Sequence, residues 1–239
     1  MSKRQKRQLR SKLFCINSMP RCGTHLLKTA IEQHPDIKCF SEVFNFFDPE
    51  CAQFSEYTVE QSLGLLEEQE AYRVGFCVHR NAETSFVESL KHRAAATRVP
   101  WNVPTIVLYR TNMFDQYVSL QRAEQSKQWQ VYEGADVPAY TPMQLDFDDV
   151  KRFFNKNRKL RFPPKIRWKR SMIISYEQLT QHTDAAVRRA LKFIGVSQID
   201  LKPTTVKTGV PVQEAVVNYD ELRQQFSTTR WKKFFQDPE

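Results

Sequence analysis

Residues 13–35 read LFCINSMPRCGTHLLKTAIEQHP, in which a short apolar run, a tight loop and an amphipathic segment follow one another. The apolar run at 13–17 is typical of a strand that is buried on both faces of a parallel sheet. From Thr24 onward, apolar residues recur at helical spacing. This helix should end at His34, because the residue before a proline is disfavoured in the α region. A strand, a loop and a helix in this order predict the opening unit of an α/β protein.

Strand and helix patterns continue to alternate along the chain. Further strands are predicted at residues 37–40, 72–78, 104–109 and 172–175. Helices are predicted near residues 58–70, 84–95, 112–128, 142–160 and 184–194. Thr141 and Pro142 supply an N-cap and a first-turn proline for the helix at 142–160. The alternation predicts an α/β fold with a mostly parallel central sheet flanked by helices.

The length of 239 residues, 41% of them hydrophobic, suffices for one well-buried core, so we expect residues 13–239 to form a single domain. The formal charge of +9 is unevenly placed. Residues 1–12 carry six Lys or Arg and residues 151–170 carry ten, and neither stretch contains Asp or Glu. We interpret residues 1–12 as a flexible basic tail and residues 151–170 as an amphipathic helix with a solvated basic face. Whether either segment binds a polyanion stays open.

The expected location of the protein and the expected state of its cysteines both rest on signals that the sequence lacks. No apolar run approaches the roughly 20 residues needed to cross a bilayer, and the basic start is not followed by the apolar core of a signal peptide. A cytoplasmic protein is therefore expected. The cysteines show no CxxC spacing, which argues against a disulfide framework or a structural zinc site. They are Cys15, Cys22, Cys39, Cys51 and Cys77.

The loop at residues 18–25 should bind an anion, because it joins a strand to a helix whose first N–H groups have no partner within the helix. Gly23 allows close approach of the backbone, Arg21 supplies a permanent forked cation, and Thr24 adds a hydroxyl donor. The GxxxxGK[ST] pattern of nucleotide triphosphatases is missing. For this loop taken alone, an ordinary turn with an exposed arginine remains the alternative.

Three segments together carry a family resemblance. INSMPRCGTHLLKTAIEQHPDI at 16–37, followed by Ser41 and Glu42, resembles the 5′-phosphosulfate loop of sulfotransferases that use 3′-phosphoadenosine 5′-phosphosulfate (PAPS), and it looks closest to the bacterial carbohydrate and nodulation-factor enzymes. TIVLYRTNMFDQYVSLQRAEQSKQW at 105–129 is similar to the family's 3′-phosphate motif, and SMIISYEQL at 171–179 to its strand and Tyr-Glu element. The resemblance implies the sulfotransferase α/β fold, which is akin to that of P-loop nucleotide kinases.

The resemblance also implies roles for individual residues. The 5′ end of PAPS would be held by loop residues, of which Arg21 and His25 would also stabilise the departing phosphate. These loop residues are Arg21, Cys22, Gly23, Thr24 and His25. Arg110 and Ser119 would bind the 3′-phosphate, Tyr176 would contact adenine, and Lys207 would close over the 3′-phosphate.

Glu42 is the expected general base, which takes the proton of an acceptor hydroxyl as its oxygen attacks sulfur. His34 and His79 are the fallback bases. The acceptor implied by the resemblance is a carbohydrate or glycolipid, and the nucleotide product is adenosine 3′,5′-bisphosphate (PAP). Neither a metal nor a nucleic acid is expected as a partner, and the oligomeric state is not determined by the sequence.

Two alternatives remain at this point. Cys15 and Arg21 have the Cx5R spacing of cysteine-dependent phosphatases, in which a thiolate attacks phosphorus. Because Cys15 falls inside the predicted strand, we interpret it as a buried strand residue. The second alternative is a non-catalytic nucleic-acid-binding protein that acts through the basic segments.

Overall fold

The computed structural model of the chain describes residues 12–41, 43, 57, 59–79, 103–129, 141–161, 170–200 and 210–236. The chain divides into two compact units. The sheet unit comprises Met1–Tyr109 and Lys165–Lys202, and the helical unit comprises Arg110–Pro164 and Pro203–Glu239.

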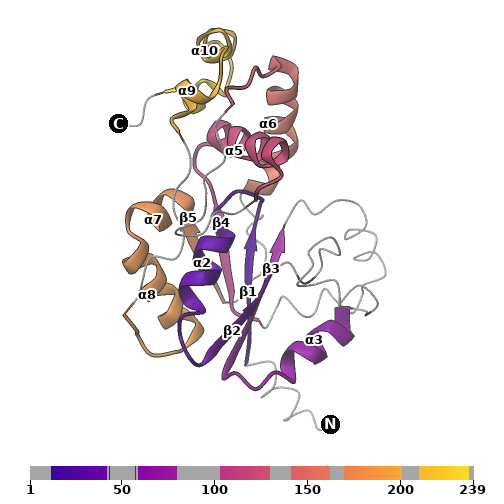
Figure 1. Cartoon of the computed structure of the whole chain (residues 1–239), viewed down its shortest axis with the longest axis vertical. Helices are drawn as coiled ribbons and strands as arrows, with labels where there is room; N and C mark the ends of the chain where they lie inside the picture. The colour runs from indigo at the N-terminus through magenta and orange to yellow at the C-terminus, as the bar shows by residue number, and fades with distance from the viewer. Residues whose placement is uncertain are drawn as a thin grey trace. The chain divides into compact units, whose positions relative to one another are not determined.

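The sheet unit is built around five parallel strands in the order β2-β3-β1-β4-β5 (Figure 1). The strands are β1 (Leu13–Ser18), β2 (Ile37–Phe40), β3 (Arg73–His79), β4 (Thr105–Tyr109) and β5 (Ser171–Ser175). Every residue of the central β1 is buried, because the strand pairs with β3 on one side and β4 on the other. The predicted parallel α/β sheet is confirmed, and the strand bounds lie within one residue of those predicted.

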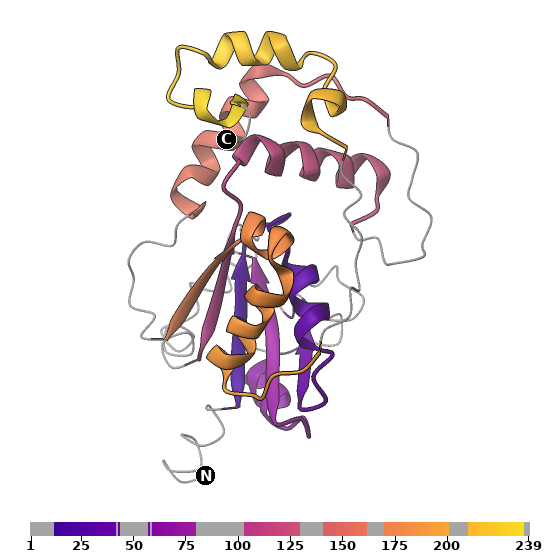
Figure 2. The same cartoon turned by 90° about the vertical axis from the view of Figure 1, so that its left-hand side faces the viewer.

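Helices cover both faces of this sheet (Figures 1 and 2). One face carries α2 (Thr24–Ile31), α7 (Tyr176–Gln181) and α8 (Thr183–Ile194), and the other carries α3 (Val59–Glu67). Side chains of β1 alternate between the two faces, as the pleat of a strand requires. A cluster on the α3 face buries Leu13 and Cys15 of β1, Val74 and Phe76 of β3, and Leu63 and Leu66 of α3.

The carboxyl ends of β1 and β4 are neighbours in the sheet, since the two strands pair in parallel from Cys15 to Asn17. From β1 the chain continues to β2 and β3 on one side of the sheet, whereas from β4 it continues to β5 on the other. Such a reversal of strand order marks the edge where open α/β sheets bind ligands. The β1–α2 loop leaves the sheet at this edge.

The helical unit has an aromatic core of its own. Its helices are α5 (Met113–Ser126), α6 (Phe147–Arg161), α9 (Val212–Ala215), α10 (Tyr219–Phe226) and the 3₁₀ helix η3 (Lys232–Phe235). The rings of Phe114 and Phe226 lie 4.4 and 5.0 Å, centroid to centroid, from the ring of Phe235. Such pairs contribute about 0.5–1.5 kcal/mol each beyond the area that they bury. The unit is therefore held together by residues far apart in the sequence.

Three predicted helix ends differ from the structure by three residues or more. Helix α6 begins at Phe147 rather than at residue 142, because Met143 instead forms a parallel bridge with Val216, and the Asp146 carboxylate accepts from the Asp149 N–H at 3.0 Å. Helix α2 ends at Ile31 rather than at His34, and α3 ends at Glu67 rather than near residue 70. The helix predicted at 84–95 and residues 1–11 of the basic tail lie outside the described residues. In the part of the chain that is described, no helix is both long and apolar enough to cross a membrane.

Candidate active site

The β1–α2 loop has the backbone shape of an anion site. Arg21 and Gly23 adopt left-handed conformations, with φ of 64° and 84°. This conformation costs a non-glycine residue roughly 1–2 kcal/mol, and such strain is concentrated at functional sites. Gly23 is the N-cap of α2 and has no side chain to bond the first N–H groups of the helix. The helix start therefore presents donors and partial positive charge to a ligand.

Tyr176 packs directly against this loop. It is the first residue of α7, immediately after β5. A Cβ atom at Gly23 would lie 3.1 Å from Tyr176 Cδ2 and 3.1 Å from Leu179 Cδ2. Gly23 is therefore required twice, by its positive φ and by the close approach of α7. The structure thus brings Tyr176 together with Gly23 of the loop.

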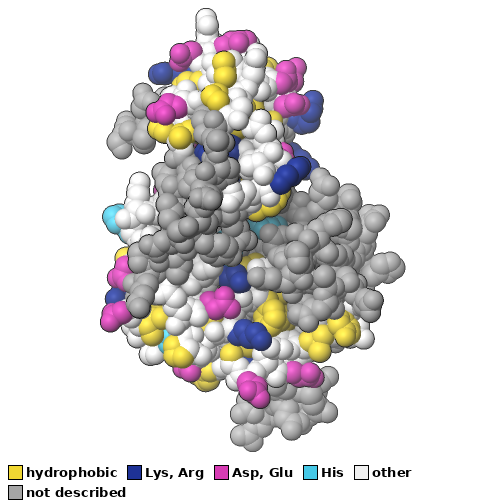
Figure 3. Space-filling view, in the orientation of Figure 1, with side chains coloured by type: hydrophobic (Ala, Val, Ile, Leu, Met, Phe, Trp, Pro, Cys, Tyr) yellow, Lys and Arg dark blue, Asp and Glu magenta, His cyan; other side chains and the backbone are white. Residues whose placement is uncertain are grey.

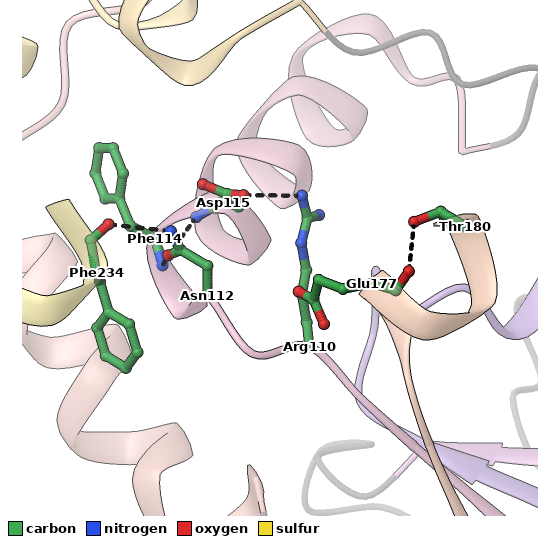
Figure 4. A network of polar contacts seen from close by, with 7 residues as sticks. All are labelled: Arg110, Asn112, Phe114, Asp115, Glu177, Thr180 and Phe234. Atoms are coloured by element: carbon green, nitrogen blue, oxygen red, sulfur yellow. Dashed lines mark hydrogen bonds and ion pairs between the residues drawn. The ribbon is translucent and has the colours of Figure 1, made fainter. Parts of the chain in front are cut away.

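The first turn of α7 is fixed by its own hydrogen bonds, which hold Tyr176 in place. Ser175 and Gln178 form a capping box, with the Gln178 N–H donating to Ser175 Oγ at 3.1 Å and the Ser175 N–H donating to Gln178 Oε1 at 3.2 Å. The Thr180 hydroxyl donates to the carbonyl oxygen of Glu177 at 3.2 Å (Figure 4). Capping of this kind typically contributes about 1 kcal/mol.

A partly buried chain of polar side chains, with Ser18 at its centre, links the loop to β3. Ser18 ends β1, pairs in register with His79 at the end of β3, and is 0% exposed. Its Oγ lies 2.6 Å from Thr24 Oγ1 and 3.1 Å from His79 Nδ1. The strand ends and the helix start are thus joined by side-chain hydrogen bonds at the ligand-binding edge of the sheet.

Arg110 and Ser119 both belong to the helical unit. Arg110 follows β4 directly, and its Nη2 lies 3.5 Å from Asp115 Oδ2 (Figure 4). Asp115 and Ser119 are one turn apart on α5 and therefore share a face of that helix. Arg110 is mostly buried, with 12% of its side chain exposed, whereas 30% of Asp115 is exposed. The two residues predicted to bind the 3′-phosphate thus have Asp115 as a common neighbour.

The start of α5 is held by Asn112. Its Oδ1 accepts from the N–H groups of Phe114 at 2.9 Å and Asp115 at 3.3 Å, and its Nδ2 donates to the carbonyl oxygen of Phe234 at 3.1 Å (Figure 4). This cap fixes the first turn of α5 to the carboxyl-terminal part of the same unit. It thereby orients Asp115 beside Arg110.

Of the three candidate bases, Glu42, His34 and His79, only the two histidines lie among the described residues. Glu42 and Lys207 lie outside the described residues. His34 precedes β2, so it lies at the amino-terminal edge of the sheet, away from the β1–α2 loop. Its ring bonds Ser197 Oγ at 3.0 Å and accepts from the Asp36 N–H at 3.1 Å, which makes it a structural residue. His79, by contrast, lies at the same edge as the loop.

Cys15 lacks the properties of a phosphatase nucleophile. It is buried in β1, where burial raises the pKa of its thiol well above the ordinary value and the neighbouring Cys77 raises it further. A reactive cysteine needs the opposite shift, because the thiolate is the nucleophile. The spacing between Cys15 and Arg21 therefore does not indicate a phosphatase.

The basic stretch 151–170 is described as far as Arg161 and again at Arg170. Helix α6 buries Val150 and Phe154 on one face. On the other face it exposes Lys151 and Arg152, and Arg152 pairs with Asp149 at 2.5 Å. Figure 3 shows Asp and Glu side chains interspersed with Lys and Arg over the helical unit. The predicted amphipathic helix is confirmed for the described part of the stretch, but its solvated face is not purely basic, because Asp148 and Asp149 are exposed in the first turn of α6.

Two further features of the candidate site concern metal binding and the residues that the sequence did not single out. Among the described side chains, no group of three or more His, Cys, Asp or Glu residues could hold a metal ion. Sequence reasoning assigned no role to Ser18 or Asp115. The available signals were weak: Ser18 is a hydroxyl at the end of an apolar run, and Asp115 is an acid in the first turn of a helix that follows a strand-end arginine.

Comparison with solved structures identifies the fold of the chain. No protein-family model matches the sequence. A sulfotransferase from Alicyclobacillus acidocaldarius superposes with a TM-score of 0.51 at 16% identity, covering 94% of this chain and 96% of that one. Mouse sulfotransferase SULT7A1 complexed with PAP superposes with a TM-score of 0.53 at 16% identity, covering 94% and 88%. The chain has the sulfotransferase fold, as the sequence motifs predicted.

Comparison with known protein sequences identifies two relatives of the chain. Nodulation protein H of Rhizobium meliloti (strain 1021) is 24% identical over 238 residues, covering 93% of this chain and 94% of that protein. A second nodulation protein H of Rhizobium meliloti matches to the same extent. Together the comparisons show a sulfotransferase fold and a sequence similar to that of nodulation protein H over more than nine-tenths of each chain.

Proposed function

We propose that the chain is a sulfotransferase that moves the sulfuryl group of PAPS to a hydroxyl group of an acceptor. The observation that carries this proposal is the strained β1–α2 loop, with Gly23 packed against Tyr176, at the ligand-binding edge of a sulfotransferase fold. In the reaction the acceptor oxygen bonds to sulfur, the bond from sulfur to the phosphate oxygen breaks, and PAP leaves.

The loop residues are assigned to the 5′ end of the nucleotide. Negative charge accumulates on the departing phosphate oxygen, so preorganised donors aimed at that oxygen lower the barrier. Arg21, Thr24 and the N–H groups that follow Gly23 supply such donors, and His25 on the same helical turn is assigned to assist them. Cys22, which is buried, contributes its backbone.

The opposite end of the nucleotide is assigned to the second motif. Arg110 and Ser119 bind the 3′-phosphate in this proposal, and Tyr176 contacts the adenine. The charge of Arg110 suits a phosphate, which a guanidinium can bind with two parallel hydrogen bonds. Lys207 is proposed as a further ligand of the 3′-phosphate.

Glu42 is proposed as the general base. Its neighbours in the sequence are held at the carboxyl end of β2: the Ser41 carbonyl oxygen accepts from the N–H groups of Cys77 at 3.0 Å and Val43 at 2.9 Å, and Val43 is fully buried. These contacts lie at the carboxyl-terminal edge of the sheet, where β3 ends and the β1–α2 loop begins. This position next to Glu42 in the sequence supports Glu42 as the base. His79 is the second candidate for this role.

The acceptor is proposed to be a carbohydrate or glycolipid hydroxyl, on the basis of the resemblance to the bacterial carbohydrate sulfotransferases. Transfer is proposed to need no metal ion, because Arg21 and the loop N–H groups can stabilise the negative charge on the departing phosphate that a metal cation would otherwise stabilise. A cytoplasmic location and a single domain over residues 13–239 remain predictions from the sequence.

The experiment that tests this function is a calorimetric titration of the full chain with PAP, AMP and ATP, with magnesium varied. We expect PAP to bind more tightly than AMP or ATP and to bind equally well in EDTA, because the proposed site holds two separate phosphate groups. Equal affinity for all three nucleotides, or a strict need for magnesium, would contradict the proposal.

A further inference from the structure

A partly buried hydrogen-bonded chain of His79, Ser18 and Thr24 in the sheet unit links three elements at the β1–α2 loop: the end of β3, the end of β1 and the first turn of α2. Ser18 Oγ lies 2.6 Å from Thr24 Oγ1 and 3.1 Å from His79 Nδ1. Ser18 has no third side-chain partner within the described residues and no exposure to solvent. Its single hydroxyl hydrogen therefore goes to one of these two neighbours.

Counting donors allows two states of the chain, since a serine hydroxyl carries one hydrogen and a neutral imidazole carries one on either nitrogen. When His79 carries its hydrogen on Nδ1, it donates to Ser18, Ser18 donates to Thr24, and the hydrogen of Thr24 is free for a ligand. When Nδ1 lacks a hydrogen, Ser18 donates to His79 and Thr24 must donate to Ser18. In that second state Thr24 presents only lone pairs to the loop.

An anion in the loop binds one of these two states more tightly than the other. A phosphate oxygen accepts hydrogen bonds, so it is attracted by a Thr24 that donates and repelled by one that presents lone pairs. We propose that His79 is a positioning residue, which acts through Ser18 to set the donor direction of the Thr24 hydroxyl, and that a 5′-phosphate in the β1–α2 loop selects the form with a hydrogen on Nδ1. This inference rests on the proposed function, which supplies the phosphate-bearing ligand.

The coupling must be reciprocal, because binding linkage is symmetric. A phosphate that gains one charge-assisted hydrogen bond in the first state shifts the ratio of the two imidazole forms by the same factor, on the order of tenfold. This role of His79 differs from that of a general base, because Nδ1 is engaged with Ser18 rather than with an acceptor.

The test is ¹⁵N NMR of the full chain labelled at histidine, since the nitrogen shifts of imidazole distinguish a nitrogen that bears hydrogen from one that does not. The resonances of His79 are assigned from their loss in His79→Asn. We expect PAP and inorganic phosphate to move His79 toward the form with hydrogen on Nδ1. Adenosine 3′-monophosphate, which has no 5′-phosphate, should leave the resonances unchanged.

Variants separate a relayed effect from direct contact of the ligand with His79. Thr24→Val and Ser18→Ala each interrupt the chain, so the response of His79 to PAP should disappear in both, while PAP still binds, about tenfold more weakly in Thr24→Val. Thr29→Val is the matched control, because the Thr29 hydroxyl on the same helix donates to the His25 carbonyl oxygen at 2.9 Å and has no part in the chain. This variant should retain the full response.

The outcomes distinguish this inference from the proposed function. If calorimetry shows that PAP binds while the His79 nitrogens do not change, the relay is wrong and the function stands. A response that persists in both Thr24→Val and Ser18→Ala also overturns the relay. If phosphate moves His79 in wild type but PAP does not bind, the relay stands and the proposed function fails.

Discussion

Replacement of Gly23 by alanine tests the geometry of the β1–α2 loop most directly. The substitution places a side chain at φ 84°, which costs roughly 1–2 kcal/mol for a residue other than glycine. It also places a Cβ 3.1 Å from both Tyr176 and Leu179, and overpacking of this kind costs about 1–3 kcal/mol. We therefore expect Gly23→Ala to lower the free energy of unfolding by about 2–5 kcal/mol if the chain keeps this conformation.

Gly64→Ala is the matched control for this substitution. Gly64 lies inside α3, and a Cβ there would meet nothing within 4 Å. Alanine is favoured over glycine inside a helix by about 1 kcal/mol, so this variant should be as stable as wild type or more stable. Replacing glycine by alanine is thus expected to lower the free energy of unfolding at position 23 and to leave it unchanged or raise it at position 64.

Urea denaturation, followed by calorimetry with PAP, measures both consequences of Gly23→Ala. If the loop instead moves to relieve the strain, the unfolding midpoint changes less, but the N–H groups at the start of α2 lose their alignment and PAP affinity falls. Gly23→Ala with both wild-type stability and wild-type PAP affinity would refute the reasoning. Tyr176→Ala in the same background should recover part of the lost stability by removing one of the two contacts.

Two further predictions concern the acceptor side and the second phosphate. Glu42→Gln should leave the PAP dissociation constant unchanged and reduce turnover by about 100-fold or more, because the amide cannot take the acceptor proton; turnover equal to wild type would remove Glu42 from the mechanism. Asp115→Asn should tighten PAP binding by up to about fivefold without changing AMP binding, because the carboxylate 3.5 Å from Arg110 competes with the 3′-phosphate. Weaker PAP binding in calorimetry would show instead that Asp115 holds Arg110 in its binding orientation.

The predictions from sequence succeeded where local signals were strong. The run at 13–17 is uniformly apolar because β1 is covered on both faces and both edges, so its burial was visible in composition alone. The position of the loop around Gly23, between a strand and a helix, was likewise predicted from the local pattern. By contrast, Pro142 suggested a helix start that did not form, because Met143 pairs with Val216 instead. Capping preferences depend on neighbouring residues and carry no information about a partner 73 residues away.

The sequence by itself determined the α/β class, the parallel sheet, the loop that is proposed to bind the 5′ end of a nucleotide and the order of its motifs, because each depends on residues that are close together in the chain. Only the tertiary structure decided that Ser18 meets His79, that Tyr176 closes on Gly23 and that His34 bonds Ser197. These outcomes depend on strand order and register, which are set by packing over the whole sheet rather than by any one segment.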